Sequence, residues 1–141
     1  MIRIKNALKE QIENHGIRTY PDECCGILLG KTEEDGTKIL AKLFITDNSR
    51  SRTEHYHRFE ISPDDLLRAE QDARKEKLDV LGFYHSHPDH PARPSEYDRQ
   101  HAFPFYSYII VSIIGSKPDD FTCWVLDKKT FQFDEEKIEF F

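Results

Sequence analysis

The sequence predicts a single domain of the mixed α/β class, in which helices flank one central β-sheet. Three observations support this prediction. Patterns of helical period alternate along the chain with short apolar runs of strand length. The length of 141 residues is usual for one domain built around one core. No repeat, low-complexity tract or long linker divides the chain, so we expect residues 1–141 to form one domain.

The first predicted helix extends over about residues 5–19. Ile4, Leu8 and Ile12 recur on one stripe, which is the spacing of a buried helical face. His15 lies near the end of this helix, and we expect its side chain to be exposed to solvent.

Three strand candidates follow the first helix. Residues 24–30 form an apolar run of strand length, and residues 38–46 form a second candidate. The turn Glu34-Asp35-Gly36 between them favours a hairpin. Residues 55–61 are the third candidate.

The second helix begins at the segment Ser62-Pro63-Asp64-Asp65. Serine can cap a helix, proline suits the first helical position, and acidic residues favour the positive end of the helix dipole. This helix should extend to about residue 77. The remaining predicted elements are a strand at 80–87, a short helix at 95–102, strands at 106–114 and 121–127, and an edge segment at 132–140.

Charge and cysteine content exclude some classes of function. The formal net charge is −6, whereas surfaces that bind phosphate backbones are basic, so nucleic acid is not an expected partner. No apolar run approaches membrane-spanning length, and the first residues lack the apolar stretch of a signal peptide, which predicts a cytoplasmic protein. Cys24, Cys25 and Cys123 are an odd number with an adjacent pair, so we expect buried thiols rather than disulfides.

The segment from His85 to Asp98 carries the chemistry. Side chains alternate along a strand, so His85 and His87 share one face while Ser86 points the other way. Two positions of strand rise span roughly 6.6 Å, from which two imidazoles can lean onto one metal ion. Three prolines stiffen the loop that leads to Asp98, which lowers the entropy cost of bringing a third ligand to the metal.

Two imidazoles and one carboxylate suit zinc and leave a fourth position for water. Iron enzymes can use the same ligands, but nothing in the sequence points to an oxygen or oxoacid cosubstrate. We therefore expect one zinc ion with a bound water, whose pKa the metal lowers from about 15.7 to about 7. Hydrolysis also needs a nearby carboxylate to pass the water proton to the leaving amine. The residues alone do not select it among the 26 acids of the chain.

Ser95 has two possible roles. It can cap the helix that follows, since Ser-x-x-Asp resembles a capping box, or it can donate a hydrogen bond to a developing oxyanion. The residues alone favour capping. We also expect that Asp98 cannot both ligate zinc and reach back to the cap.

Glu23, His85-Ser86-His87-Pro88 and Ser95-Glu96-Tyr97-Asp98 together resemble the JAMM (JAB/MPN-plus) metallopeptidase family. The family pattern is an upstream glutamate, then His-x-His, ten intervening residues and aspartate, with serine three positions before that aspartate. The resemblance covers nearly the whole chain. Further segments that carry it are residues 21–30 and 59–63, and residues 92–95 and 106–111 resemble the short bacterial Mec-type branch.

The resemblance implies a fold similar to that of the cytidine deaminases. It implies that His85, His87 and Asp98 bind the zinc, that Glu23 is the general acid/base, and that Ser95 supports the oxyanion, which reverses the order of its two roles. The Mec-type branch hydrolyses the amide bond after the C-terminal Gly-Gly tail of ubiquitin-like sulfur-carrier proteins. Such a tail would add as a strand, and residues 53–61 are the expected edge. The alternatives are a deubiquitinase-like isopeptidase of other specificity and a non-catalytic MPN binding or scaffold module.

Other groupings of reactive residues are weaker candidates. His55-Tyr56-His57 repeats the His-x-His pattern without the Ser-x-x-Asp sequel, so we expect it not to bind metal. His90 and His101 flank the motif and could contact its ligands. A cysteine hydrolase would need a thiolate at Cys24 or Cys25, where the apolar strand favours burial. A zinc deaminase would need His-x-Glu and Pro-Cys-x-x-Cys, and the sequence has neither.

Overall fold

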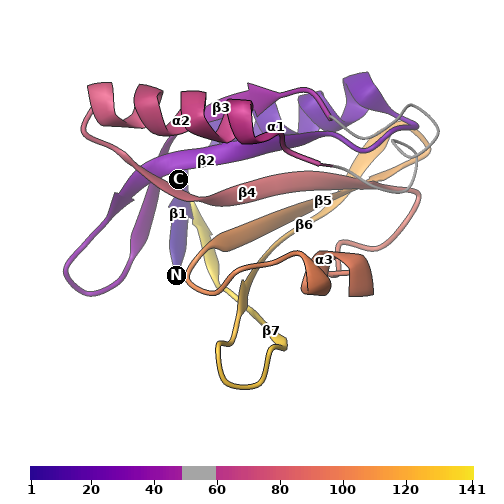
Figure 1. Cartoon of the computed structure of the whole chain (residues 1–141). Helices are drawn as coiled ribbons and strands as arrows, with labels where there is room; N and C mark the ends of the chain where they lie inside the picture. The colour runs from indigo at the N-terminus through magenta and orange to yellow at the C-terminus, as the bar shows by residue number, and fades with distance from the viewer. Residues whose placement is uncertain (49–59) are drawn as a thin grey trace.

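The structure, a computed structural model, describes residues 1–48 and 60–141. Its elements follow one another in a mixed order of strands and helices (Figure 1). They are β1 (Ile2–Ile4), α1 (Asn6–Thr19), β2 (Cys25–Thr32), β3 (Lys38–Thr46), α2 (Pro63–Lys75), β4 (Asp79–Pro88), α3 (Glu96–Gln100), β5 (Ser107–Ile114), β6 (Lys117–Leu126), β7 (Phe133–Glu135) and β8 (Ile138–Phe140).

All described strands belong to one sheet with the order β7-β6-β5-β4-β2-β3-β1-β8. The sheet is mixed, because β4 and β5 are parallel, β1 is parallel to β3 and β8, and the other pairs are antiparallel. The predicted mixed α/β fold with one sheet is therefore confirmed, and so is the hairpin of β2 and β3.

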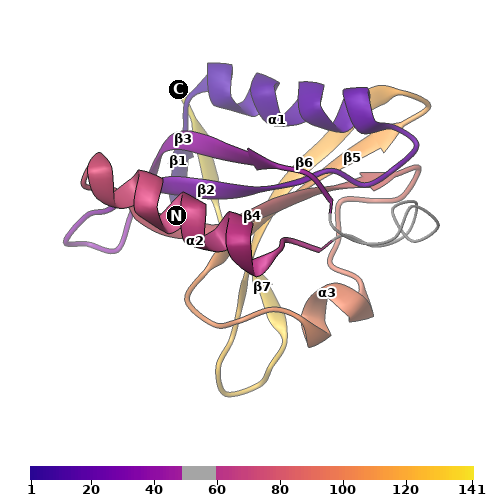
Figure 2. The ribbon, with the colours of Figure 1, turned by 45° about the horizontal axis from the view of Figure 1, so that its top comes forward.

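Helices cover both faces of this sheet (Figure 2). Leu8 and Ile12 of α1 pack in a core with Leu28 and Tyr84. On the other face, Ala69 and Ala73 of α2 pack with Ile27 and Leu29. Neighbouring residues of β2 thus enter different cores, since successive side chains of a strand point to opposite faces. This burial on both sides explains why the strand is a continuous apolar run.

The second helix starts as the sequence predicts. Ser62 is the N-cap, and its side chain accepts a hydrogen bond from the Asp65 N–H at 3.1 Å. In the described part of the chain, no helix has both the length and the apolar composition that a bilayer crossing requires.

The C-terminal edge segment was predicted wrongly as one piece. It consists of β7 and β8, which lie at opposite edges of the sheet. Only Glu136 and Lys137 separate these strands, so the curled sheet brings its two edges together (Figure 1). The Glu136 N–H bonds the Cys123 carbonyl at 2.7 Å, and the Ile2 N–H bonds the Lys137 carbonyl at 2.9 Å. Hydrogen bonds to both edges, rather than local propensity, therefore divide this segment.

Two further expectations near the N-terminus were wrong. Ile4 belongs to β1 and not to the helix. His15 is 6% exposed and its Nδ1 lies 2.8 Å from the Tyr84 hydroxyl. The cause is Gly16, where an added Cβ would lie 2.9 Å from the Ile113 side chain. The helix approaches the sheet closely at this point, and it buries His15 as it does so.

The predicted strand at 55–61 falls mostly outside the described residues, and Glu60 and Ile61 are not in a strand.

Candidate metal centre

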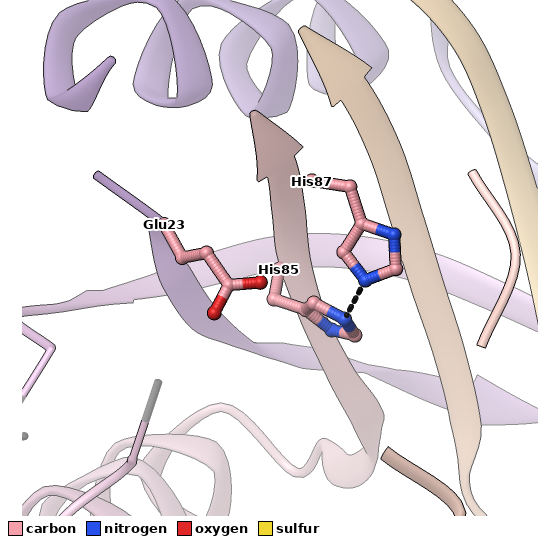
Figure 3. Close-up of side chains that lie close together, drawn as sticks. All are labelled: Glu23, His85 and His87. Carbon is pink, nitrogen blue, oxygen red and sulfur yellow. Dashed lines mark hydrogen bonds between the residues drawn. The ribbon is translucent and has the colours of Figure 1, made fainter. Parts of the chain in front are cut away.

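The strand β4 brings His85 and His87 to one face of the sheet (Figure 3). Their Nε2 atoms lie 3.0 Å apart, and the two side chains are 2% and 7% exposed respectively. Ser86 points to the other face, where its Oγ accepts a hydrogen bond from the Cys24 N–H at 2.8 Å. The alternation predicted from the sequence therefore holds at this strand.

Asp98 reaches the two histidines from α3. Its Oδ2 lies 3.2 Å from the Nε2 of His85 and 3.2 Å from the Nε2 of His87. Ligand atoms of a tetrahedral zinc site are about 3.3 Å apart when the bonds are about 2.0–2.1 Å long. The two Nε2 atoms and Oδ2 therefore converge at the spacing that such an ion needs.

Glu23 lies next to the histidines because β2 pairs with β4. Cys25 is the partner of His85 in this antiparallel pair, and the Ser86 N–H continues the ladder to the Cys24 carbonyl at 3.2 Å. The side chain two positions before Cys25 therefore falls on the face of the histidines (Figure 3). One ligand atom each from Glu23, His85 and His87 lies within 4.8 Å of the others, and Glu23 is 7% exposed.

Two carboxylates, those of Asp98 and Glu23, thus lie where they could provide a third metal ligand beside the histidines. One oxygen of Asp98 lies 3.2 Å from the Nε2 of both imidazoles, which fits a third ligand. The Glu23 carboxylate lies within 4.8 Å of a ring nitrogen of each histidine, so it is the remaining carboxylate that can act near a metal ion without binding it.

The charges of the cluster suit a cation. Burial lowers the pKa of His85, and it outweighs the attraction of the Asp98 carboxylate. Burial also opposes protonation of His87, but the hydrogen bond and charge of Asp98 raise its pKa. Although burial opposes ionisation of Asp98, the two histidines hold its pKa well below the usual range. An ionised carboxylate next to buried imidazoles provides the lone pairs that a metal ion accepts.

The loop after β4 sets the tautomer of His87. Its Nδ1 lies 2.8 Å from the Pro91 carbonyl oxygen, which can only accept, so Nδ1 carries the proton and Nε2 keeps its lone pair. The neighbouring carbonyls are also held. The Ser112 hydroxyl donates to the His90 carbonyl at 2.6 Å, and the Thr122 hydroxyl donates to the Ala92 carbonyl at 2.7 Å. Neither hydroxyl could be foreseen from the sequence, because nothing local distinguishes Ser112 or Thr122 from other strand residues.

Ser95 and Asp98 form a complete capping box. The Ser95 Oγ accepts from the Asp98 N–H at 3.0 Å, and the Asp98 Oδ2 accepts from the Ser95 N–H at 2.8 Å. The cap does not draw the Asp98 carboxylate away from the histidines, since the same Oδ2 lies 3.2 Å from the Nε2 of each. One carboxylate oxygen has lone pairs for more than one partner, and Oδ2 faces the cap and both histidines together.

The cysteines are buried, as predicted, at 1% exposure for Cys24 and 0% for Cys25 and Cys123. Burial raises the pKa of Cys24 to about 11 and that of Cys25 to about 12. Neither thiol is poised as a nucleophile at neutral pH, which argues against a cysteine hydrolase.

A cavity of about 270 Å³ opens beside His85 and Asp98. His101 lines it, with its ring stacked on Tyr97 at 4.0 Å between ring centroids. The remaining wall is mostly apolar and was not foreseen from the sequence. Its members are Glu60, Ile61, Leu66, Phe83, Pro94, Phe103, Tyr108, Ile110 and Phe133. His90 takes part in the loop through its backbone carbonyl. His55 and His57 lie outside the described residues.

Known proteins resemble this chain over most of its length. A family model described as prokaryotic homologs of the JAB domain matches residues 5–127. A desampylase from Pyrococcus furiosus is 30% identical over 116 residues, which are 82% of this chain and 74% of that protein. The Lys-63-specific deubiquitinase BRCC36 from Xenopus tropicalis is 29% identical over 123 residues, covering 82% of this chain but only 44% of that longer protein.

A solved structure of a protein from Desulfitobacterium hafniense is 31% identical and has a TM-score of 0.87, covering 100% of this chain and 93% of that one. The fold and the cluster of histidines and carboxylates define a metal-dependent hydrolase of the JAMM class. The chain belongs to the family of prokaryotic JAB-domain proteins.

Proposed function

We propose that the protein is a zinc-dependent peptidase or isopeptidase that hydrolyses the amide bond after the C-terminal Gly-Gly tail of a ubiquitin-like sulfur-carrier protein. The observation that carries the proposal is the convergence of Asp98, His85 and His87 at ligand spacing, with Glu23 buried beside them.

In this proposal, His85, His87 and Asp98 hold a single zinc ion. Nε2 of each histidine and Oδ2 of the aspartate are the donor atoms, and their spacing fits the ion. When bound, zinc acts as a Lewis acid that makes water a nucleophile at neutral pH and polarises a carbonyl group. The proton on His87 Nδ1, fixed by Pro91, keeps the correct nitrogen available for the ion.

Glu23 is the proposed general acid/base. Its carboxylate accepts the proton of the attacking water and then donates it to the nitrogen of the leaving amine. The carboxylate lies on the face of the histidines, with one oxygen within 4.8 Å of a ring nitrogen of each. Burial at 7% exposure shields the transferred proton from bulk solvent.

Ser95 is proposed to stabilise the oxyanion while it also caps α3. Its Oγ serves as the acceptor for the Asp98 N–H, so its own hydroxyl hydrogen is left to donate to a substrate oxygen. The two roles considered for Ser95 are therefore compatible. The cap fixes the position of the hydroxyl, and the hydroxyl supplies the hydrogen bond to the developing charge.

The substrate class is suggested by the relatives. Desampylase and Lys-63-specific deubiquitinase are names of proteins that act on ubiquitin-like modifiers and ubiquitin, and both are similar to this chain over 82% of its length. The apolar cavity next to His85 can receive the end of an extended tail. The segment predicted to pair with this tail, residues 53–61, falls mostly outside the described residues.

The test uses zinc-loaded protein and a ubiquitin-like sulfur-carrier protein that bears one cysteine after its Gly-Gly tail. Release of cysteine is followed by mass spectrometry. We expect release by the wild type and a loss of about 10²–10⁴-fold in Glu23→Gln, with the zinc content unchanged. The matched control is Glu10→Gln on the exposed side of α1, which should keep full activity.

Several results would refute the proposal. Purified protein without stoichiometric zinc, and without activity after zinc is added, would favour a scaffold module instead. Full activity in Glu23→Gln would reject the acid/base assignment. Retention of zinc in His87→Ala would reject the ligand set.

A further inference from the structure

Three exposed phenylalanines lie on the loops that follow α3 and β6, and one of them, Phe103, lines the cavity beside the candidate metal centre. Phe103 is 65% exposed, Phe105 75% and Phe131 56%, and we name this set the aromatic rim. Moving apolar side chains of this size out of water is favourable, so a group of them on the surface marks a contact site. These phenylalanines could not be foreseen from the sequence as a surface group, because their exposure depends on the fold.

The rim residues come from two loops that lie side by side. Phe103 and Phe105 belong to the segment between α3 and β5, and Phe131 belongs to the turn before β7 (Figures 1 and 2). The Lys128 Nζ of that turn lies 5.8 Å above the Phe105 ring, and the Arg99 guanidinium of α3 donates to the Phe131 carbonyl at 3.4 Å. These contacts join both loops to the helix that carries Asp98.

Two members of the rim have an unfavourable backbone conformation. Phe105 has φ = 78° and Phe131 has φ = 55°, both in the left-handed region that bulky residues rarely adopt. Residues held in such a conformation cluster at active sites and ligand clamps. The two exposed phenylalanines are thus also sites of backbone strain.

The rim is continuous with the cavity at the candidate metal centre. Phe103 lines the same cavity as His85 and Asp98, and its N–H bonds the Tyr108 hydroxyl at 2.8 Å. The ring of Phe83 in the cavity wall packs against Tyr106 at 5.3 Å between centroids, next to Phe105 in the chain. Phe103 therefore belongs both to the cavity wall and to the aromatic rim.

We propose that the aromatic rim binds the folded body of the ubiquitin-like substrate, whose tail lies in the cavity. This inference rests on the proposed function. An extended tail of four to six residues spans about 13–20 Å, so the body that carries it contacts the surface next to the cavity mouth. The rim fits an aliphatic patch on that body, and Lys128 fits an acidic group at the edge of the patch.

The test compares two substrates in the zinc-loaded enzyme. One is the full-length carrier protein with a cysteine after Gly-Gly, and the other is a peptide of its last six residues with the same cysteine. The main variant is Phe105→Gly, because glycine adopts a positive φ without strain. We expect KM for the full-length substrate to rise about ten-fold or more, with KM for the peptide and both kcat values unchanged.

The Tm of the same variant is a second readout. If Phe105 served only to stabilise the fold, its replacement would lower the Tm. Removing strain at φ = 78° should leave the Tm equal to or above that of the wild type, although the ring is lost. The matched control is Ile114→Ser, which changes a 43% exposed apolar residue at the opposite end of β5. We expect this control to alter neither KM.

Equal KM shifts for the two substrates, or no shift for either, would overturn the rim inference while the proposed function stands. A wild-type enzyme that cleaves the peptide but has the same KM for both substrates would overturn it too. Failure of the wild type to cleave either substrate would refute the proposed function, and with it the inference.

Discussion

The hydroxyls of Ser112 and Thr122 should control zinc affinity without touching the ion. Both lie on the face of the two histidines, because Ser112 is the β5 partner of His87 and Thr122 pairs with Ile110, the β5 partner of His85. Each donates to a carbonyl next to Pro91, whose own carbonyl orients the His87 ring. We expect Ser112→Ala and Thr122→Val to loosen this loop and to weaken zinc binding.

The magnitude follows from the hydrogen bonds. Each bond contributes about 0.5–1.5 kcal/mol, and a change of about 1.4 kcal/mol is ten-fold in affinity. Each variant should therefore weaken zinc binding by roughly 2- to 12-fold. Thr122 Oγ1 also accepts from the Trp124 indole N–H at 2.8 Å, so its hydroxyl hydrogen is committed to the Ala92 carbonyl. The double variant should approach the loss of about 10–100-fold that is typical when a partner of a ligating histidine is removed.

Two measurements check this prediction. Zinc affinity is measured by competition with a chromophoric chelator, and the tautomer of His87 is read from imidazole nitrogen shifts in metal-free protein. The control is Asp35→Ala, which removes one side-chain hydrogen bond of 2.9 Å to Thr37 in the turn between β2 and β3. If the double variant binds zinc as tightly as the wild type, the proposed control of zinc affinity by these hydroxyls is refuted, whatever the tautomer of His87 is found to be.

Two predictions concern the opposite face of the sheet. Gly26→Ala should destabilise the fold by about 1–3 kcal/mol in urea unfolding, because the new Cβ would lie 2.1 Å from the Tyr84 ring. Adding Tyr84→Leu should recover much of this loss of stability. A double variant that is no more stable than Gly26→Ala would contradict the packing argument. Burial lowers the pKa of His15, so as the pH falls the imidazole takes up a proton more readily in the unfolded protein than in the folded one. The free energy of unfolding should therefore keep the full contribution of His15 above about pH 6.5 and decline below that pH. The decline should be smaller in His15→Gln, as measured by urea unfolding at several pH values.

Local patterns in the sequence determined those features that depend on neighbouring residues. Alternation along one strand places His85 and His87 together, and the Ser62 and Ser95 caps begin α2 and α3 where the sequence predicts. The proline-rich loop to Asp98 is also local, so the close approach of Asp98 to the two histidines could be predicted. These features depend little on contacts with distant parts of the chain, since periodicity and capping act over a few residues.

Only the tertiary structure decided how distant segments meet. Glu23 lies beside the histidines because β2 pairs with β4 in one register, and a shift of one residue would turn it to the other face. Sequence patterns could not show that β7 and β8 take opposite edges, or that Gly16 brings His15 against Tyr84. The hydroxyls that hold the loop and the aromatic rim are likewise products of strand order, because partners across a sheet leave no mark on the local sequence.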